Sequence, residues 1–284
     1  MGLDREKLLH AIGSAGTQAA GLWQFLEDGA MSKTLHTANG TLCGLRSARL
    51  AALGFTAAED ILAGDRGLLG AMTPDNHPEA LTRALSWDNC ALLTNSLKPY
   101  ACCRHTHART TAPNCCGGAR LEPEHITRIV DHTYQVAVNT VDNPEPSTPY
   151  GYKFSGQYCT AAMLVYGHLG ESAFTPEATS DPRVRRLMDK ITLVCDPELE
   201  ASYQADRNRW AHRLEVTLED GRVLTRQVEY PYGDFNNPFT WAYEHEKFHT
   251  LADGVLGPDR VAALVERLPH LEELDDINRL FEGL

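Results

Sequence analysis

The change in hydrophobic periodicity along the chain is the feature that most limits its possible folds. Near both ends, apolar residues recur every three or four positions, which is typical of amphipathic helices. In the middle, residues 214–218 and 223–230 alternate around Asp220-Gly221, a dipeptide that favours a hairpin turn. This order predicts an α+β fold: a mainly helical domain with an inserted or following α+β lid domain.

The same pattern predicts three regions and their elements. The regions are a partial helical domain at residues 1–95, an α+β lid domain at 96–240, and C-terminal helices at 241–284 that return to the helical domain. Helices are expected at residues 8–26, 42–53, 56–63, 78–85, 157–169, 182–190, 241–251 and 259–268, with a final amphipathic segment after Pro269. Strands are expected at residues 129–138, 191–195, 214–218 and 223–230.

Composition narrows the class of protein further. The chain has 38 acidic and 26 basic residues, a net charge of -12 and 43% hydrophobic residues, which is an ordinary globular composition without a basic stripe for nucleic acid. No apolar run approaches the length of a membrane span, and the first residues have no signal-peptide core. We therefore expect a cytoplasmic protein whose eight cysteines are free thiols.

Two motifs suggest metal or thiol chemistry, and each also has a structural interpretation. Residues 245–249 match H-E-x-x-H, in which two histidines one helical turn apart bind zinc. They lack the metzincin extension, so a solvated helix face is favoured. Residues 102–107 combine two adjacent cysteines with two histidines, and Cys115-Cys116 follow. Adjacent cysteines are poor zinc ligands because they point in different directions, so packed side chains are favoured over a metal site or a Cys-His nucleophile.

Two lysines stand out because cations are scarce in this chain. Lys33 precedes His36, and Lys98 precedes the Cys-Cys-Arg-His segment. Both lie at the ends of apolar segments, where an anion-binding pocket would need them, although each could be a surface lysine. Tyr158 lies in an apolar helix, where the alternative is a core tyrosine with its hydroxyl satisfied.

Four separated motifs together resemble a known family. They lie at residues 20–36 (AGLWQFLEDGAMSK followed by LH), 98–107 (KPYACCRHTH), 153–158 (KFSGQY) and 230–238 (YPYGDFNNP). In this order they are similar to the MmgE/PrpD family, which includes 2-methylcitrate dehydratases, cis-aconitate decarboxylases and an iminodisuccinate epimerase.

The resemblance implies a helical domain plus a lid domain, a homodimer, and an active site between the domains that needs no metal or organic cofactor. It implies catalytic roles for Lys33, Lys98, Tyr158 and His36, with Arg104 and His105 binding substrate. Elimination of water or carbon dioxide from a citrate-like polyacid needs cations that hold carboxylates and groups that move a proton, which these residue types can supply.

Departures from the family pattern leave three hypotheses. Met1 begins after a helical segment that family members carry, residues 38–41 lack a usual basic residue, residues 110–118 interrupt an expected helix, and Tyr232 replaces a common basic residue. The chain is therefore a cofactor-free lyase acting on a di- or tricarboxylate, or a dicarboxylate epimerase or racemase on the same scaffold. The third hypothesis is an inactive fragment, or a subunit that needs a complementing N-terminal part.

Overall fold

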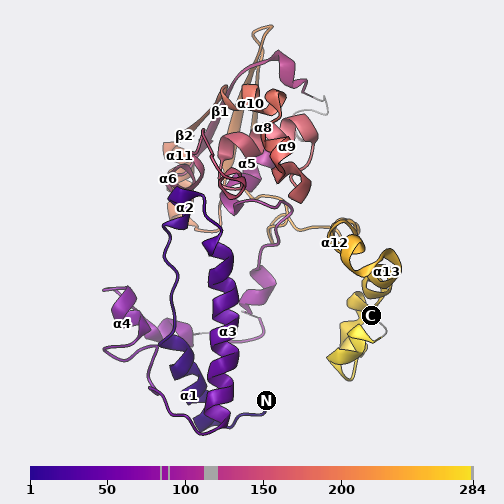
Figure 1. The fold of residues 1–284 in the computed structure, drawn as a ribbon. Coiled ribbons are helices and arrows are strands. Elements are labelled where there is room, and N and C mark those ends of the chain that lie inside the picture. Colours follow the sequence, from indigo (N-terminus) through magenta and orange to yellow (C-terminus); the bar gives the residue numbers. More distant parts are fainter. Residues whose placement is uncertain (84, 89, 112–120, 283–284) are drawn as a thin grey trace.

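A computed structural model gives the structure of the protein and describes residues 1–83, 85–88, 90–111 and 121–282. In this part of the chain, helices surround one mixed sheet, and other helices extend away from it (Figure 1). The α-helices are α1 (Arg5–Gly16), α2 (Phe25–Asp28), α3 (Ser32–Ala52), α4 (Leu68–Met72), α5 (His107–Thr111), α6 (Gln135–Val141), α7 (Pro149–Tyr152), α8 (Gly156–Tyr166), α9 (Pro176–Thr179), α10 (Pro182–Met188), α11 (Pro197–Ala205), α12 (Trp241–Leu256) and α13 (Pro258–Arg267). The strands are β1 (Ile126–Thr133), β2 (Ile191–Cys195), β3 (His212–Leu218) and β4 (Val223–Val228). Short 3-10 turns include η3 (Arg104–Thr106), η7 (Leu268–Glu273) and η8 (Ile277–Phe281).

The sheet has the strand order β2-β1-β3-β4. Strand β1 pairs with β2 in parallel, through a crossover that includes helices α6 to α10, and with β3 in antiparallel. Strands β3 and β4 form the antiparallel hairpin, in which Gly221 has a φ of 84°. The combination of helices with this mixed sheet confirms the α+β class, whereas the lid arrangement stays a prediction.

The core lies between the sheet and the helices α8 and α10. Ile129, Leu193 and Leu214 point from three strands into a cluster of buried apolar side chains. Helix α8 contributes most of its residues to that cluster, which explains its nearly uniform apolar sequence. Asp131, Thr133 and His212 lie on the same buried face of the sheet, so this face also carries polar groups that must find partners.

Two helical parts extend away from the sheet. Helix α1 packs against α3, and α12 packs against α13, to one side of α3 in Figure 1. Both parts leave large apolar side chains exposed, among them Leu35 and Leu42 on α3 and Trp241 and Val255 on α12. The three-region division predicted from the sequence stays a prediction. Among the described residues, none of the helices combines the length and the apolar character that a bilayer span requires.

The predicted helix at residues 8–26 is wrong in its second half. Helix α1 ends at Gly16, and α2 is a separate short helix. A Cβ atom at Gly13 would lie 2.2 Å from the carbonyl oxygen of Ala58, so α1 packs closely on that segment. Gly21 then has a φ of 152°, which a helix does not allow. The helix predicted at residues 56–63 is also wrong, since the structure has turns there.

The predicted strand at residues 129–138 is right only in its first part. Strand β1 ends at Thr133, and Tyr134 adopts an extended backbone as the N-cap of α6. Val136 and Val138 alternate as in a strand but belong to this helix, because tertiary contacts override their local preference. Helix α11 was not expected from the sequence. After α13 the chain forms the turns η7 and η8.

Several local predictions are confirmed. Strand β2 has the expected bounds, and the hairpin has the expected turn. Asp181 caps α10 by accepting a hydrogen bond from the backbone N–H of Arg183 at 2.8 Å. Helix α3 is longer than expected and begins at Ser32, which places Lys33 in its first turn.

Candidate active site

The segment at residues 96–107 carries most of the candidate site, and other parts of the chain hold its backbone. The N–H of Leu97 donates to the carbonyl of Gly233 at 2.8 Å, and the N–H of Cys103 donates to the carbonyl of Lys153 at 2.8 Å. We call residues 96–107 the site segment. Its conformation therefore depends on contacts with two distant parts of the sequence.

The motif at residues 230–238 acts as a clamp on the site segment. The carboxylate of Asp234 is buried and accepts hydrogen bonds from Ser96 Oγ at 2.8 Å and Arg104 Nη2 at 2.9 Å. Gly233 has a φ of 86°, and a Cβ atom there would lie 2.3 Å from the carbonyl oxygen of Leu97. Only glycine fits this contact, so the Gly-Asp pair fixes where the site segment lies.

Lys33 and Lys98 lie close enough for their charges to interact. Burial lowers the pKa of Lys98, and the neighbouring charges of Lys33 and Arg104 lower it further. Lys98 Nζ donates to the carbonyl of Cys102 at 3.1 Å, and Lys33 Nζ lies 4.9 Å from the ring centroid of Phe154. We call Lys33, Lys98 and Arg104 the cation cluster. Among the described residues only Arg104 of the three has a carboxylate partner, Asp234.

Cys103 lies within electrostatic reach of both lysines and was not expected as a site residue. Its side chain is buried, and burial raises the pKa of the thiol although the charges of Lys33 and Lys98 oppose this. The thiol therefore keeps its proton near neutral pH. The sequence signal was present in the Cys-Cys pair, but only the fold shows that Cys103 lies beside the lysines.

His105 follows Cys103 and is held by two aromatic residues. Its Nδ1 lies 2.7 Å from the hydroxyl oxygen of Tyr134, and its ring stacks on Trp210 with centroids 4.4 Å apart and planes 5° apart. Burial, followed by the charges of His212, Arg109 and the two lysines, lowers the pKa of His105 to about 4. The imidazole is therefore neutral near pH 7.

His36 lies one helical turn after Lys33 on α3. Its ring meets that of Phe25 edge-on, with centroids 5.7 Å apart, and a Cβ atom at Gly21 would lie 3.4 Å from its Nδ1. The structure thus places His36 against the segment before α3, while Lys33 reaches towards Phe154. A catalytic role for His36 stays a prediction.

Tyr158 lies inside the core rather than in the cation cluster. Its side chain is fully buried, its hydroxyl donates to the carbonyl of Ala173, and its ring packs on Tyr152 and Phe174. Burial raises its pKa, and the side chains that add to this effect do not include the site lysines. The charge of Lys33 acts on Lys98, whereas Tyr158 lies apart in the core. The catalytic roles of Lys33, Lys98 and Tyr158 stay predictions.

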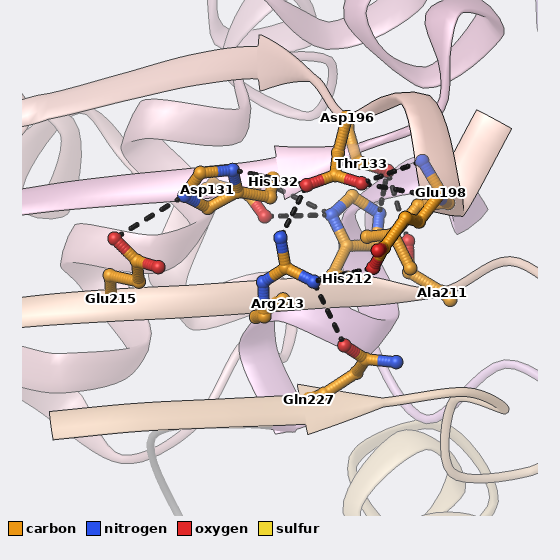
Figure 2. A network of polar contacts seen from close by, with 11 residues as sticks. Asp131, His132, Thr133, Asp196, Glu198, Ala211, His212, Arg213, Glu215 and Gln227 are labelled. Atoms are coloured by element: carbon orange, nitrogen blue, oxygen red, sulfur yellow. Dashed lines mark hydrogen bonds and ion pairs between the residues drawn. The ribbon is translucent and has the colours of Figure 1, made fainter.

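A network of buried charged side chains joins α5, which begins at the end of the site segment, to strands β1 and β3. Arg109 Nη1 lies 2.9 Å from Asp131 Oδ2, and His212 Nδ1 lies 2.9 Å from Asp131 Oδ1. Figure 2 shows His212 between Asp131 and Thr133, whose hydroxyl lies 3.2 Å from His212 Nε2. This network carries no signal in the sequence, because its members are far apart in the chain and join only when β1, β3 and α5 pack together.

The described residues offer no group of three or more His, Cys, Asp or Glu side chains that could hold a metal ion. His249 of the H-E-x-x-H motif lies 3.0 Å from Asp253 on the same helix. Cys102 and Cys103 are free thiols, as are the other described cysteines, which confirms the free-thiol prediction for them. Cys115 and Cys116 lie outside the described residues.

Comparison with known proteins agrees with the arrangement of these motifs. The model of the MmgE/PrpD N-terminal domain matches residues 1–81, and that of the MmgE/PrpD C-terminal domain matches residues 100–270. The chain belongs to the MmgE/PrpD family. Within this family member, the motifs at residues 153–158 and 230–238 hold the backbone of the site segment, which itself contains a third motif.

Relatives in the MmgE/PrpD family are named as lyases. The chain is 27% identical to the cis-aconitate decarboxylase-like protein oryM of Aspergillus oryzae over 99% of its own length and 60% of that protein. It is 28% identical to the cis-aconitate decarboxylase of Aspergillus terreus over its whole length and 60% of that protein. A third relative, the 2-methylcitrate dehydratase of Cupriavidus necator, is 35% identical over 38% of this chain. The chain thus spans about 60% of the length of the two decarboxylase relatives.

Proposed function

We propose that the cation cluster binds a citrate-like di- or tricarboxylate and that the chain acts as a lyase of the decarboxylase or dehydratase type. The observation that carries the proposal is that Lys33 and Lys98 lie within electrostatic reach of each other without a carboxylate partner among the described residues. In a chain with 38 acidic and 26 basic residues, these are two cations within electrostatic reach of each other that no ion pair neutralises among the described residues.

Electrostatics at the cluster favours an anionic ligand. Two like charges close together repel each other, and an anion between them removes this repulsion. Lys33 also lies in the first turn of α3, which has no acidic residue there, so the positive end of the helix dipole adds to the field. A ligand with two or three carboxylates can contact several of these cations at once.

The neighbouring groups can supply the chemistry of an elimination. Cations that hold the carboxylates also stabilise the negative charge that develops beside them when a proton or carbon dioxide leaves. Lys98 is suited to accept and return a proton because its lowered pKa raises the fraction of free amine. Cys103 keeps its proton and can only donate it or a hydrogen bond. The names of the decarboxylase and dehydratase relatives support this reaction type.

Binding can be tested on the purified chain by calorimetric titration with citrate. Lys33→Gln and Lys98→Gln should each lower the affinity by about tenfold or more, because each removes one charge-assisted contact. Lys7→Gln makes the same charge change on α1, outside the cluster, and should bind citrate as the unmodified chain does. Equal affinities in all four proteins would refute the carboxylate site.

Turnover distinguishes the three hypotheses for the reaction. Release of carbon dioxide from cis-aconitate would identify a decarboxylase. Formation of a carbon-carbon double bond from 2-methylcitrate, with release of water and followed by absorbance, would identify a dehydratase. Exchange of a carbon-bound proton of a dicarboxylate with solvent, without a double bond, would identify an epimerase. Citrate binding without either reaction would identify a chain that needs a complementing part.

A further inference from the structure

We propose that Tyr134 is a positioning residue that holds His105 in the Nε2–H tautomer, so that His105 presents a neutral hydrogen-bond donor to a carboxylate oxygen of the ligand. The inference concerns a residue outside the four sequence motifs, at the junction of β1 and α6. Its functional part rests on the proposed carboxylate site. Its structural part, the tautomer, can be measured without any ligand.

The direction of the Tyr134–His105 hydrogen bond follows from the surroundings of the hydroxyl. Tyr134 is fully buried, and burial together with Tyr203, which stacks on it at 4.2 Å, raises its pKa so that the hydroxyl keeps its proton. Among the described residues, His105 Nδ1 is the hydrogen-bond partner of this hydroxyl, at 2.7 Å. A buried hydroxyl donates where an acceptor is available, so Nδ1 accepts the proton of Tyr134.

A neutral imidazole with an accepting Nδ1 must carry its own proton on Nε2. Burial is the main cause that disfavours the imidazolium form, and the charges of His212, Arg109, Lys33 and Lys98 add to it. The titratable group in direct contact with the ring is Tyr134. His105 is therefore neutral near pH 7, and Nε2–H is its single polar hydrogen.

The orientation of this N–H is fixed by stacking. Trp210 lies parallel to the imidazole, and the hydrogen bond to Tyr134 fixes rotation within the plane, so Nε2–H points away from Tyr134. Among the described residues Nε2 has no hydrogen-bond partner, whereas Nδ1 has one. His105 is partly exposed and lies within electrostatic reach of two lysines, so its donor suits one oxygen of a carboxylate that those lysines hold.

This geometry separates two roles that a histidine can have. A histidine with a proton on Nε2 and an accepted hydrogen bond on Nδ1 can donate to the ligand but cannot take a proton from it at Nε2. Proton removal then belongs to another group, for which Lys98 is suited. His105 contributes recognition of a hydrogen-bond acceptor, which favours a carboxylate oxygen over a protonated amine at this position.

The tautomer can be measured by long-range proton-nitrogen NMR correlation on the full chain labelled with nitrogen-15 histidine. Comparison with His105→Gln assigns the signals of His105. The expected spectrum between pH 6 and 8 shows a protonated Nε2 and an unprotonated Nδ1, with no conversion to the imidazolium form. Tyr134→Phe should mix the two tautomers, because Nδ1 loses its donor. Tyr203→Phe keeps the ring that stacks on Tyr134 and should leave the Nε2–H tautomer in place.

Binding of citrate to His105 variants tests the donor role. Gln offers an N–H near the position of Nε2, so His105→Gln should retain citrate affinity within about threefold, while His105→Leu should lose about tenfold. An Nδ1–H tautomer or an imidazolium at pH 7 would overturn the inference, as would equal affinity of the Leu and Gln variants. Absence of citrate binding in the unmodified chain, with the Nε2–H tautomer observed, would refute the proposed function and the ligand contact but leave the positioning by Tyr134 established.

Discussion

Substitution of Gly156 by alanine should destabilise the protein strongly, although local preference favours alanine at this position. Gly156 begins α8, where alanine has the better helix propensity. In the structure, however, a Cβ atom at Gly156 would lie 2.0 Å from Arg109 Nη1 and 2.8 Å from its Cζ. Arg109 is fully buried and paired with Asp131, so it cannot move out into solvent without breaking the ion pair.

The magnitude follows from these two effects. Overpacking of a buried site costs about 1–3 kcal/mol, and separating a buried charge from its partner costs about 3–5 kcal/mol. We expect partial relief by a shift of the guanidinium, and therefore a loss of roughly 3 kcal/mol from the free energy of unfolding. For a protein of this size that corresponds to a fall of about 6–12 °C in Tm.

Gly44→Ala is the matched control. Gly44 is an exposed residue inside α3, and a Cβ atom there would meet nothing within 4 Å, so alanine should stabilise the protein by about 1 kcal/mol. Urea and thermal unfolding followed by circular dichroism measure both variants. If Gly156→Ala is as stable as the unmodified chain while Gly44→Ala behaves as expected, the Arg109 guanidinium does not lie against Gly156.

Three further predictions concern the clamp, the lysine and the buried network. Asp234→Asn should lower the citrate affinity and cost about 2 kcal/mol of stability, because Arg104 loses a partly buried ion pair, whereas Asp220→Asn in the exposed hairpin turn should change neither. Citrate affinity should fall as pH rises through the lowered pKa of Lys98, below the usual value of 10.5, and Lys98→Gln should abolish that part of the pH profile; an unchanged profile would contradict the role of this lysine. Burial would raise the pKa of Asp131, but the charges of Arg109 and His212 outweigh burial and hold this pKa below its usual 3.8. The ionised carboxylate therefore stabilises the fold above about pH 4, and this contribution is lost on further acidification. In a plot of the free energy of unfolding against pH, Asp131→Asn should weaken the fall at acidic pH. It should also lower the free energy of unfolding at pH 7.

Elements that depend on neighbouring residues could be predicted from the sequence. The β3–β4 hairpin, β2 and the capped start of α10 follow from turn residues, short apolar runs and a capping aspartate. The prediction of a strand after Thr133 was wrong, because the alternating valines there are equally compatible with a strand and a short helix. Only the packing of α6 beside β2 and η3 decides between them.

The sequence by itself determined the family, the α+β class and the residues that could form an anion site, because these depend on local patterns and on short motifs. Only the tertiary structure decided which of them lie near one another: the charges of Lys33 and Lys98 act on Cys103, while the Tyr158 hydroxyl donates to a backbone carbonyl in the core. It also revealed that Tyr134 meets His105 and that Asp234 anchors Arg104, contacts that span 29 and 130 positions of the chain. Such contacts leave no local signal, since the chain must first bring β1, α3 and the site segment together before their side chains can interact.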